Sequence, residues 1–484
     1  MRDSNQRNDR DEVLLEELIQ LFGAKIEHSD LAKQAYGLDW TRFYEPDPLC
    51  VFFPENNADV SDIVRFAIKN ELAVVPSGGR TGLSGGAVAR QQEIVVSFEK
   101  MNKILSYDEV DEIVEVQAGV ITQVLQNFAL EHDRYYPVDF ASSGSSQIGG
   151  NIATNAGGIK VLRYGLTRQW VAGLKVITGT GEMLELNKGL TKNATGYDLR
   201  HLFIGSEGTL GLIVEASIKL TIKPNNLSVA FLAVPKMADC ISVLNSFKQS
   251  LNLTAFEFLS HQALCHVLRE SDESAPFDVA SDYYVLAEYE SPLETGGEGK
   301  TGSDSSSGSE EAVIAVFESC VEQGWVTDGV ISQSEAQAKS LWRYREAISE
   351  SITPFTPYKN DIAVRISKIP ELLEAVEHVI ERRCPEFEIV WFGHIGDGNV
   401  HLNILKPASW ETETFKSTCE VVSEEVMAIV ATFEGSISAE HGVGLLKRNQ
   451  LPYTRSEGEI ALMKSIKQVF DPKGIMNPGK MFPA

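Results

Sequence analysis

The feature that most constrains the fold is a change of sequence pattern near residue 225. Residues 48–225 alternate short apolar segments with helical segments and are dense in glycine. After residue 225 glycine is rarer, and longer helical patterns alternate with strands. At 484 residues the chain is too long for one ordinary domain. Two or three domains are therefore expected, and the repeated strand–helix–strand pattern after residue 225 predicts a single α+β sheet domain there.

We place the domain boundaries after residues 225 and 431. The first domain, 1–225, begins with an amphipathic helix, and the second, 226–431, carries the longer helices. The remaining segment, 432–484, holds one helical pattern and the Pro/Gly-punctuated stretch DPKGIMNPGKMF. It is too small to fold alone and should pack back on a larger domain.

Two further segments of the second domain carry local predictions. The stretch EAQAKSLWRYREAISESI predicts one helix over residues 335–352. The Gly/Ser/acidic stretch at residues 295–312 predicts a flexible surface loop, because it has too few apolar residues to pack.

The charge and the cysteines bound the function and the compartment. The net charge is -25 and the pI is about 4.8, which argues against nucleic acid and anionic membranes as partners. The six cysteines are scattered without a CxxC pair, so neither a disulfide framework nor a metal–thiolate site is expected. The chain shows no leader pattern and no apolar run of about 18 residues. We therefore expect a cytoplasmic protein without a membrane span.

Three glycine-rich segments indicate a phosphate-bearing ligand. The first, PSGGRTGLSGG at residues 76–86, has five glycines in eleven residues after an apolar strand, so its N–H groups can turn inward around an anion. It matches neither GxGxxG nor a P-loop. Similar segments lie at residues 144–158 and 205–211. Three such segments in one domain favour an extended ligand, and a dinucleotide fits best.

The segment HIGDGNVH, from His394 to His401, indicates a metal site. Its Gly-Asp-Gly-Asn core favours a turn that brings both imidazoles together. By the two-residue period of a strand, His401 and Asn403 share a face. Glu440 would add a carboxylate, as borderline metals accept, and His441 would lie beside the metal as a base. The alternative is a pair of hairpin histidines bonded to backbone carbonyls.

Seven ordered motifs together resemble a known family. They are PSGGRTGLSGG, GGNIATNAGG, RYG, TGYDLRHLFIGSEGTLG, GHIGDGNVHLN, SAEHGVGLLKR and DPKGIMNPGK. This order resembles the FAD-dependent 2-hydroxyacid dehydrogenases of the vanillyl-alcohol-oxidase type flavoprotein superfamily, over nearly the whole chain from residue 48. The resemblance implies an FAD-binding α+β domain, an α+β substrate domain, and a C-terminal segment that returns to the FAD domain.

The resemblance also implies the cofactor residues. The first loop would hold the FAD pyrophosphate, and the second and third glycine-rich segments would line the flavin and the adenine side, with a residue of the tail closing over the cofactor. These residues are Pro76, Ser77, Gly78, Gly79, Arg80, Thr81, Gly82, Ser143, Gly149, Asn151, Thr154, Gly158, Glu207, Ile213 and Asn477. Members that bind flavin covalently often carry a histidine directly after the SGG. Arg80 occupies that position here, so FAD is expected to be noncovalent.

For the metal and the base, the resemblance implies the residues that the histidine pattern had already indicated. It assigns His394, His401 and Glu440 as ligands of Zn²⁺ or a similar divalent ion, and His441 as the catalytic base. For the substrate it implies Asn403 with three residues of the second domain, Arg345, Ser349 and Lys359.

Arg345 and Ser349 are four residues apart, so one helix would present both on a single face. The alternative for Arg345 is an ion pair with Glu346 or Glu350, and for Lys359 a pair with Asp361, the commoner fate of surface cations.

The expected activity is hydride transfer from a D-2-hydroxyacid to flavin. The members that oxidise D-2-hydroxyglutarate to 2-oxoglutarate are the most similar, because Arg345 and Lys359 could bind a second carboxylate. A D-lactate or glycolate dehydrogenase and a flavin-binding subunit of an electron-transfer complex are the alternatives. The expected partners are the small 2-hydroxyacid and an electron-transferring flavoprotein or another acceptor. The sequence leaves the oligomeric state open, with a homodimer as one alternative.

Overall fold

The structure is a computed structural model that describes residues 2–41, 43–271, 274–290 and 307–483. The chain divides into two compact units. The first unit comprises residues 1–158, 166–223 and 440–484, and the second comprises 159–165 and 224–439. The sequence had placed the boundaries after residues 225 and 431 and had not separated residues 159–165 from the first domain.

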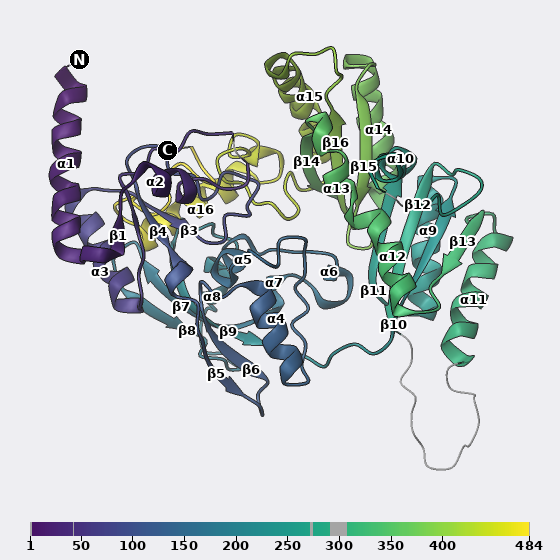
Figure 1. The fold of residues 1–484 in the computed structure, drawn as a ribbon, viewed down its shortest axis with the longest axis horizontal. Coiled ribbons are helices and arrows are strands. Elements are labelled where there is room, and N and C mark those ends of the chain that lie inside the picture. The colour runs from purple at the N-terminus through teal and green to yellow at the C-terminus, as the bar shows by residue number, and fades with distance from the viewer. Residues whose placement is uncertain (1, 42, 272–273, 291–306, 484) are drawn as a thin grey trace. The chain divides into compact units, whose positions relative to one another are not determined.

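The first unit contains nine strands and several helices within the described residues (Figure 1). Its strands are β1 (Ile26–Glu27), β2 (Cys50–Phe52), β3 (Val74–Ser77), β4 (Ile94–Ser97), β5 (Ile104–Asp108), β6 (Ile113–Gln117), β7 (Val171–Thr178), β8 (Met183–Leu186) and β9 (Gly211–Lys219). Its α-helices are α1 (Arg2–Phe22), α2 (Asp30–Tyr36), α3 (Asn57–Asn70), α4 (Thr122–Glu131), α5 (Ile148–Thr154), α7 (Thr167–Trp170), α8 (Arg200–Phe203) and α16 (Glu457–Phe470). Short 3-10 turns lie at Gly23–Lys25, Phe98–Lys100 and Leu451–Tyr453.

These strands form two sheets. In the first, of order β1-β2-β4-β3, strands β2, β4 and β3 run parallel. Their apolar side chains pack with α1 and α3 in one core, to which Phe52, Ile63 and Ile94 belong. The second sheet, of order β5-β6-β9-β7-β8, is antiparallel and packs on α4, α5 and α16. Both sheets contribute to the surroundings of the loop that follows β3.

The C-terminal tail belongs to the first unit, as the resemblance implied. The Val74 N–H donates to the carbonyl of Ile475, and the Asn477 N–H donates to the carbonyl of Val74, each at 2.8 Å. Ile475 and Met476 are buried in the same core as β3. The tail therefore completes the hydrogen bonding of an edge strand that would otherwise stay open.

The second unit is built on a seven-stranded sheet within the described residues (Figure 1). Its strands are β10 (Leu227–Val234), β11 (Asn252–Ser260), β12 (Tyr283–Glu290), β13 (Asp328–Ile331), β14 (Tyr358–Ala363), β15 (Glu388–Gly393) and β16 (Asn399–Leu405). Its α-helices are α6 (Val161–Tyr164), α9 (Met237–Ser250), α10 (His261–Glu270), α11 (Ser307–Glu322), α12 (Glu335–Glu346), α13 (Ile348–Ser351), α14 (Ile369–Arg383) and α15 (Thr412–Thr432), with 3-10 turns at Thr353–Phe355 and Ile366–Lys368.

The strand order β13-β10-β12-β11-β15-β16-β14 is antiparallel throughout. Helices α10, α12 and α13 pack on one face, where Phe231, Leu286 and Phe392 belong to a common core. Helices α9, α11, α14 and α15 contact one another in pairs and cover the other face. Near one edge of the sheet, the histidine motif spans the turn after β15 and the start of β16, and β14 pairs with β16.

Two local predictions for the second unit are corrected by the structure. Residues 307–312 belong to helix α11 rather than to a loop, because the apolar positions that follow extend the helix upstream; the remainder of that predicted loop, residues 295–306, lies outside the described residues. The helix expected over 335–352 is interrupted at Ala347, which separates α12 from α13.

Candidate functional site

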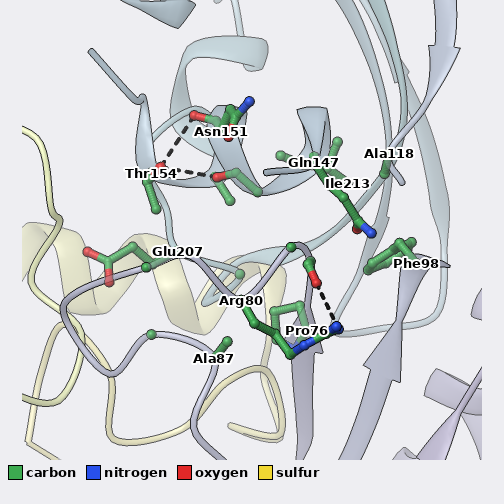
Figure 2. A pocket seen from close by; sticks show the side chains of 18 of the residues that line it. Pro76, Arg80, Ala87, Phe98, Ala118, Gln147, Asn151, Thr154, Glu207 and Ile213 are labelled. Carbon is green, nitrogen blue, oxygen red and sulfur yellow. Dashed lines mark hydrogen bonds between the residues drawn. The ribbon is translucent and has the colours of Figure 1, made fainter. Parts of the chain in front are cut away.

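A cavity opens in the first unit beside the loop that follows β3. It encloses about 900 Å³ of empty volume, part of it open to solvent. Figure 2 shows Pro76 and Arg80 from this loop on one side and Asn151 and Thr154 from α5 on another.

Most residues predicted from the sequence to hold the cofactor line this cavity. They are Pro76, Gly78, Gly79, Arg80, Thr81, Gly82, Gly149, Asn151, Thr154, Glu207 and Ile213. They come from the three glycine-rich segments, which lie far apart in the chain and meet here. The structure thus brings the three segments around one space, as expected for a single extended ligand.

Two glycines of the lining show why small residues are needed. A Cβ on Gly79 would lie 2.2 Å from the carbonyl oxygen of Ser145, so the first loop can pack on the second segment only with glycine there. A Cβ on Gly150 would meet nothing within 4 Å, although Gly150 lines the cavity. Protein packing therefore does not require glycine at position 150. A ligand that approaches the backbone closely would require it.

The sequence did not single out several other lining residues, among them Asp39, Phe98, Ala118 and Gln147. They lie outside the glycine-rich patterns or are unremarkable within them, so only the tertiary structure identifies them. The Gln147 Oε1 atom is buried and has no hydrogen-bond partner in the described part of the chain. A buried acceptor beside an apolar wall fits a ligand that offers a donor at that point.

Four predicted cofactor residues are not part of the cavity lining. Ser77 is buried and its Oγ donates to the carbonyl of Tyr36 at 3.1 Å. Ser143 accepts at its carbonyl from the N–H of Gln123 at 3.0 Å. The N–H of Gly158 donates to Glu440 Oε1 at 2.9 Å. The Asn477 Nδ2 donates to the carbonyls of Gly86 (2.9 Å) and Glu207 (2.7 Å), so this residue ties the tail to two lining segments.

Glu207 has a structural task beside its place at the cavity. Its Oε1 accepts the N–H of Val443 at 2.7 Å, and its Oε2 accepts the N–H of Gly444 at 2.8 Å. Burial raises the pKa of this carboxyl, while the two N–H groups and Lys447 counteract the rise. The carboxylate therefore holds the SAEHGVG segment, which carries Glu440 and His441, against the cavity wall.

The histidine motif forms the predicted hairpin. Strands β15 and β16 pair in antiparallel register with Phe392 opposite His401, and the turn lies between them. Gly398 has a φ of +94°, and a Cβ there would lie 2.2 Å from the carbonyl oxygen of Val364, so the turn needs glycine. The His394 and His401 rings stand at 85° with centroids 5.3 Å apart. The turn therefore brings the two imidazoles together as expected.

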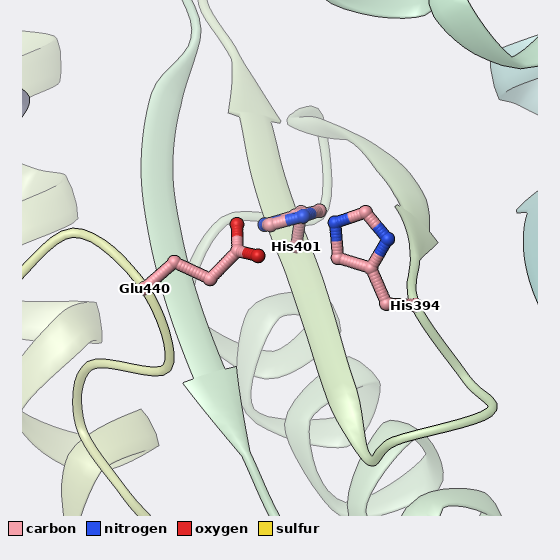
Figure 3. A group of neighbouring side chains, drawn as sticks. All are labelled: His394, His401 and Glu440. Carbon is pink, nitrogen blue, oxygen red and sulfur yellow. The ribbon is translucent and has the colours of Figure 1, made fainter. Parts of the chain in front are cut away.

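Glu440 joins the two histidines in a group that could hold a metal (Figure 3). One ligand atom from each side chain lies within 4.8 Å of the others. The donor set of two imidazoles and one carboxylate suits zinc and similar divalent ions. These are the three residues that the sequence had assigned as ligands, and the metal itself stays a prediction.

Each histidine has a carboxylate neighbour on the same sheet face. The His394 Nδ1 lies 2.8 Å from Glu257 Oε1, and the His401 Nδ1 lies 3.6 Å from Asp361 Oδ1. Asn399 Nδ2 donates to the same Asp361 oxygen at 2.8 Å. Carboxylates in these positions orient imidazoles whose other nitrogen binds a metal.

Sequence reasoning missed Glu257 as a functional residue. It lies on β11 between Phe256 and Phe258 and is 1% exposed. An acidic residue between two phenylalanines of a buried strand was the available signal, since unpaired carboxylates are rarely buried. Burial favours its neutral form, but the charges and hydrogen bonds of His394 and Arg345 outweigh it and lower the pKa of this carboxyl.

Arg345 projects from α12 onto this sheet face and is 8% exposed. Its Nε and Nη2 both lie 2.9 Å from Glu257 Oε2, and its guanidinium stands 4.8 Å from the centre of the Phe392 ring. The guanidinium thus forms a buried ion pair with Glu257 and not the helix-neighbour pair that the sequence offered as an alternative. Its end-on edge, Nη1 with Nη2, retains hydrogens for a second carboxylate.

The other predicted substrate residues differ in exposure. Asn403 is 1% exposed on β16, in register with Lys359 on β14. Desolvation lowers the pKa of the Lys359 ammonium, and the side chain keeps exposed surface. Ser349 is exposed on α13 and Arg345 is buried on α12, and their common role in substrate binding stays a prediction. The expectation that one helix presents Arg345 and Ser349 assumed a continuous helix, and this helix is interrupted at Ala347.

His441 lies in the segment that Glu207 holds. The neighbouring Gly442 has a φ of +80°, and a Cβ there would approach Glu207 Oε1 to 3.0 Å. Glycine therefore lets the chain turn close to the carboxylate directly after His441. The backbone of the predicted base is fixed from one side by a buried acidic residue.

Comparisons with known proteins define first the class and then the family. A model described as "FAD binding domain" matches residues 48–187, so the chain is a flavoprotein with its FAD-binding domain in the first unit. A second model, "FAD linked oxidases, C-terminal domain", matches residues 223–481, more than half of the chain. The chain belongs to the family of FAD-linked oxidases, and its expected membership of this flavoprotein class is confirmed.

Curated relatives extend over nearly the whole chain. A protein of Stutzerimonas stutzeri named "D-2-hydroxyglutarate dehydrogenase" is 52% identical over 98% of this chain and 100% of its own length. A protein of the same name from Xanthomonas citri pv. viticola is 50% identical, covering 97% and 96%. An Arabidopsis thaliana protein named "D-2-hydroxyglutarate dehydrogenase, mitochondrial" is 37% identical, covering 92% and 77%.

Solved structures agree on the fold. A structure titled "4-ethylphenol oxidase from Gulosibacter chungangensis: isoeugenol complex" has a TM-score of 0.73 at 14% identity and covers 98% of both chains. An alkyldihydroxyacetonephosphate synthase has a TM-score of 0.70 at 18% identity, covering 96% of this chain and 85% of its own. At such identities the likeness concerns the fold alone. The predicted α+β flavoprotein fold is confirmed.

Within the described residues, every helix is too short or too polar to cross a bilayer.

Proposed function

We propose that this chain is an FAD- and metal-dependent dehydrogenase that oxidises D-2-hydroxyglutarate to 2-oxoglutarate. The observation that carries the proposal is the 52% and 50% identity to two proteins named for this activity, over at least 96% of each chain. The paired histidines with a nearby carboxylate and the buried Arg345 supply the chemistry that a 2-hydroxy diacid requires.

The cavity of the first unit would hold FAD, with the PSGGRTG loop around the pyrophosphate. When bound, FAD supplies the acceptor for the hydride that leaves the α-carbon of the substrate. Arg80 stands where covalent members carry histidine, and its guanidinium lies 4.3 Å from the ring centre of Tyr36. An arginine cannot form the histidyl–flavin bond, so we infer noncovalent FAD. Acid precipitation should release all of the yellow flavin into the supernatant, and flavin retained in the washed pellet would contradict this inference.

His394, His401 and Glu440 would hold a divalent metal such as zinc. When bound, the ion supplies positive charge that lowers the pKa of the substrate α-hydroxyl. A neutral imidazole suits the removal of the hydroxyl proton near neutral pH, and this role falls to His441. Glu207 fixes the segment of His441 through the N–H groups of Val443 and Gly444.

The substrate carboxylates need cations because the chain as a whole is strongly negative, with a net charge of -25. Arg345 with Lys359 would bind the carboxylate distal to the reacting carbon, and Asn403 would donate a hydrogen bond. A monocarboxylic 2-hydroxyacid such as lactate offers no second carboxylate to the end-on edge of Arg345, which Glu257 leaves open. This difference favours the diacid.

Flavin bleaching tests the proposal directly. Purified yellow protein is mixed anaerobically with D-2-hydroxyglutarate, its L-enantiomer, D-lactate or glycolate, each with and without a chelator. We expect rapid bleaching by the D-diacid, its loss on chelation and its recovery with zinc. Bleaching by D-lactate or glycolate in its place would retain the chemistry but contradict the substrate. Bleaching that survives complete removal of metal would contradict the metal role.

We infer an electron-transferring flavoprotein as acceptor, as the resemblance implied, and retain the cytoplasm as the predicted compartment. Steady-state reduction of an artificial dye by the purified protein with substrate separates an enzyme active alone from a subunit that works only within a complex. Light scattering decides between a monomer and a homodimer.

A further inference from the structure

One buried carboxylate contacts two predicted site residues that have different tasks. Glu257 lies near the middle of the seven-stranded sheet of the second unit, on β11, with 1% of its surface exposed. Its Oε1 is paired with His394 and its Oε2 with Arg345. Glu257 belongs to β11, His394 directly follows β15, and Arg345 belongs to α12, so a single group connects two parts of the sheet and a helix.

The contact with His394 determines which ring nitrogen can bind a metal. With Glu257 Oε1 at 2.8 Å from Nδ1, the carboxylate accepts the Nδ1–H and thereby assigns the proton to that nitrogen. The lone pair of the imidazole is then on Nε2, which is the nitrogen left for the ion. Loss of such an outer partner commonly weakens metal binding 10- to 100-fold.

The contact with Arg345 determines how the guanidinium is presented. Nε and Nη2 each lie 2.9 Å from Glu257 Oε2, and the ring of Phe392 lies against the guanidinium at 4.8 Å. These contacts fix the plane of the guanidinium and compensate its buried charge. The remaining end-on edge is held in one orientation for a carboxylate.

We propose that Glu257 is a positioning residue that fixes His394 as a metal ligand and Arg345 as a carboxylate-binding cation at the same time. Metal affinity and affinity for the second carboxylate of the substrate then depend on one side chain. This inference rests on the proposed function, and it adds a residue that neither the motifs nor the resemblance assigned.

A second buried acidic residue of the same sheet provides a matched control. Glu288 lies on β12, 5% exposed, and its carboxylate accepts from Lys160, Thr254 and Trp342. In the part of the chain that the structure describes, these hydrogen-bond partners include neither a predicted metal ligand nor a predicted substrate residue. A general effect of removing a buried charge should therefore appear in Glu288→Gln as strongly as in Glu257→Gln.

The experiment measures zinc affinity of metal-stripped protein by competition with a fluorescent zinc indicator. Glutamine at position 257 has one side-chain oxygen, which can accept from His394 or from Arg345. Its amide NH2 group, itself a donor, then faces the N–H groups of the other partner. We expect Glu257→Gln to bind zinc 10- to 100-fold more weakly than the wild type, and Glu288→Gln to match the wild type. The conservative Glu257→Asp keeps the charge and should recover part of the affinity.

Kinetics supply the second readout. Glu257→Gln, reloaded with saturating zinc, should show a raised KM for D-2-hydroxyglutarate, and a smaller change of KM for any monocarboxylic 2-hydroxyacid that the wild type oxidises. A purely structural role would lower the amount of folded protein without separating the two substrates. Near-ultraviolet circular dichroism checks the fold of every variant, and Glu257→Asp serves if Glu257→Gln does not fold.

The possible failures are distinguishable. If the wild type binds no zinc and ignores the diacid, the proposed function fails. If the wild type does both while Glu257→Gln and Glu257→Asp retain its zinc affinity and its KM, the positioning role of Glu257 is wrong. Equal weakening of zinc binding in Glu257→Gln and Glu288→Gln would also overturn it, because the effect would then be general.

Discussion

At the scale of single residues, two buried carboxylates order the surroundings of the predicted site. Glu207 accepts two main-chain N–H groups of the SAEHGVG segment, and Glu257 accepts from an imidazole and a guanidinium. A buried carboxylate is tolerated only when its oxygens are paired. In each unit, therefore, a buried acidic side chain holds in place residues to which catalytic or binding roles were predicted.

A buried lysine predicts how the stability of the first unit depends on pH. Lys480 is 3% exposed, its Nζ donates to the carbonyl of Val88, and desolvation lowers its pKa to about 8. An unfolded lysine keeps its proton to about pH 10.4. Between these values the unfolded state binds more protons, so stability rises with pH across this window. The wild type should gain up to about 3 kcal/mol relative to Lys480→Met between pH 8 and pH 10.4.

Urea unfolding followed by release of flavin fluorescence measures this difference at several pH values. Lys464→Met, at an exposed position of α16, serves as the control and should follow the wild type. Parallel curves for the wild type and Lys480→Met would contradict the prediction.

The predicted substrate cation gives a second prediction at this scale. Arg345→Ala removes a charged hydrogen-bonding partner of the distal carboxylate, which should lower kcat/KM for D-2-hydroxyglutarate about 10- to 100-fold. Any turnover of D-lactate should change little, since lactate has no distal carboxylate. Steady-state kinetics with both substrates test this, with Arg343→Ala on the exposed side of α12 as the control. An equal loss on both substrates would indicate damage to the shared site.

At the scale of elements, two glycines separate packing from ligand binding. A Cβ on Gly79 would lie 2.2 Å from the Ser145 carbonyl, so Gly79→Ala should displace the loop and cost about 1–3 kcal/mol of stability. A Cβ on Gly150 meets nothing within 4 Å in α5, so Gly150→Ala should stabilise the helix by up to about 1 kcal/mol. It should nevertheless weaken FAD binding, because the methyl group takes space at the cavity wall.

Thermal unfolding of the apoprotein and FAD titration by flavin fluorescence distinguish these effects. The expected result is a lowered Tm for Gly79→Ala, and an unchanged or raised Tm with a larger Kd for Gly150→Ala. If Gly150→Ala bound FAD as the wild type does, the ligand would not approach α5 at this position.

At the scale of the whole molecule, the first unit is assembled from three stretches of the chain. The tail supplies hydrogen bonds to Val74 on both sides and buries Ile475 and Met476 in the core of the first sheet. Removal of residues 471–484 should therefore leave a protein that retains no FAD and whose first unit is rapidly cleaved by protease. Met476→Ala, which leaves a cavity in the same core, should cost about 2–5 kcal/mol but still bind FAD. Full FAD content in the truncated protein would contradict this account.

The sequence alone determined the parts whose chemistry is local. Glycine content identified the segments around the cavity. Where the backbone packs as closely as it does at Gly79, there is no space for a Cβ, so only glycine is accepted. The turn in HIGDGNVH and the two-residue period of a strand predicted the histidine pair, since both depend on neighbouring residues only. The ordered motifs also indicated the flavoprotein class.

Only the tertiary structure decided which distant side chains meet. Glu257 and Arg345 are 88 residues apart and pair through a sheet whose strand order cannot be read from local pattern. The same holds for Gln147 and Phe98 at the cavity, and for the break at Ala347 that separates Ser349 from Arg345. The physical reason is that burial and ion pairing depend on packing between elements, whereas turns, strand periods and close backbone approach are set within a few residues of the chain.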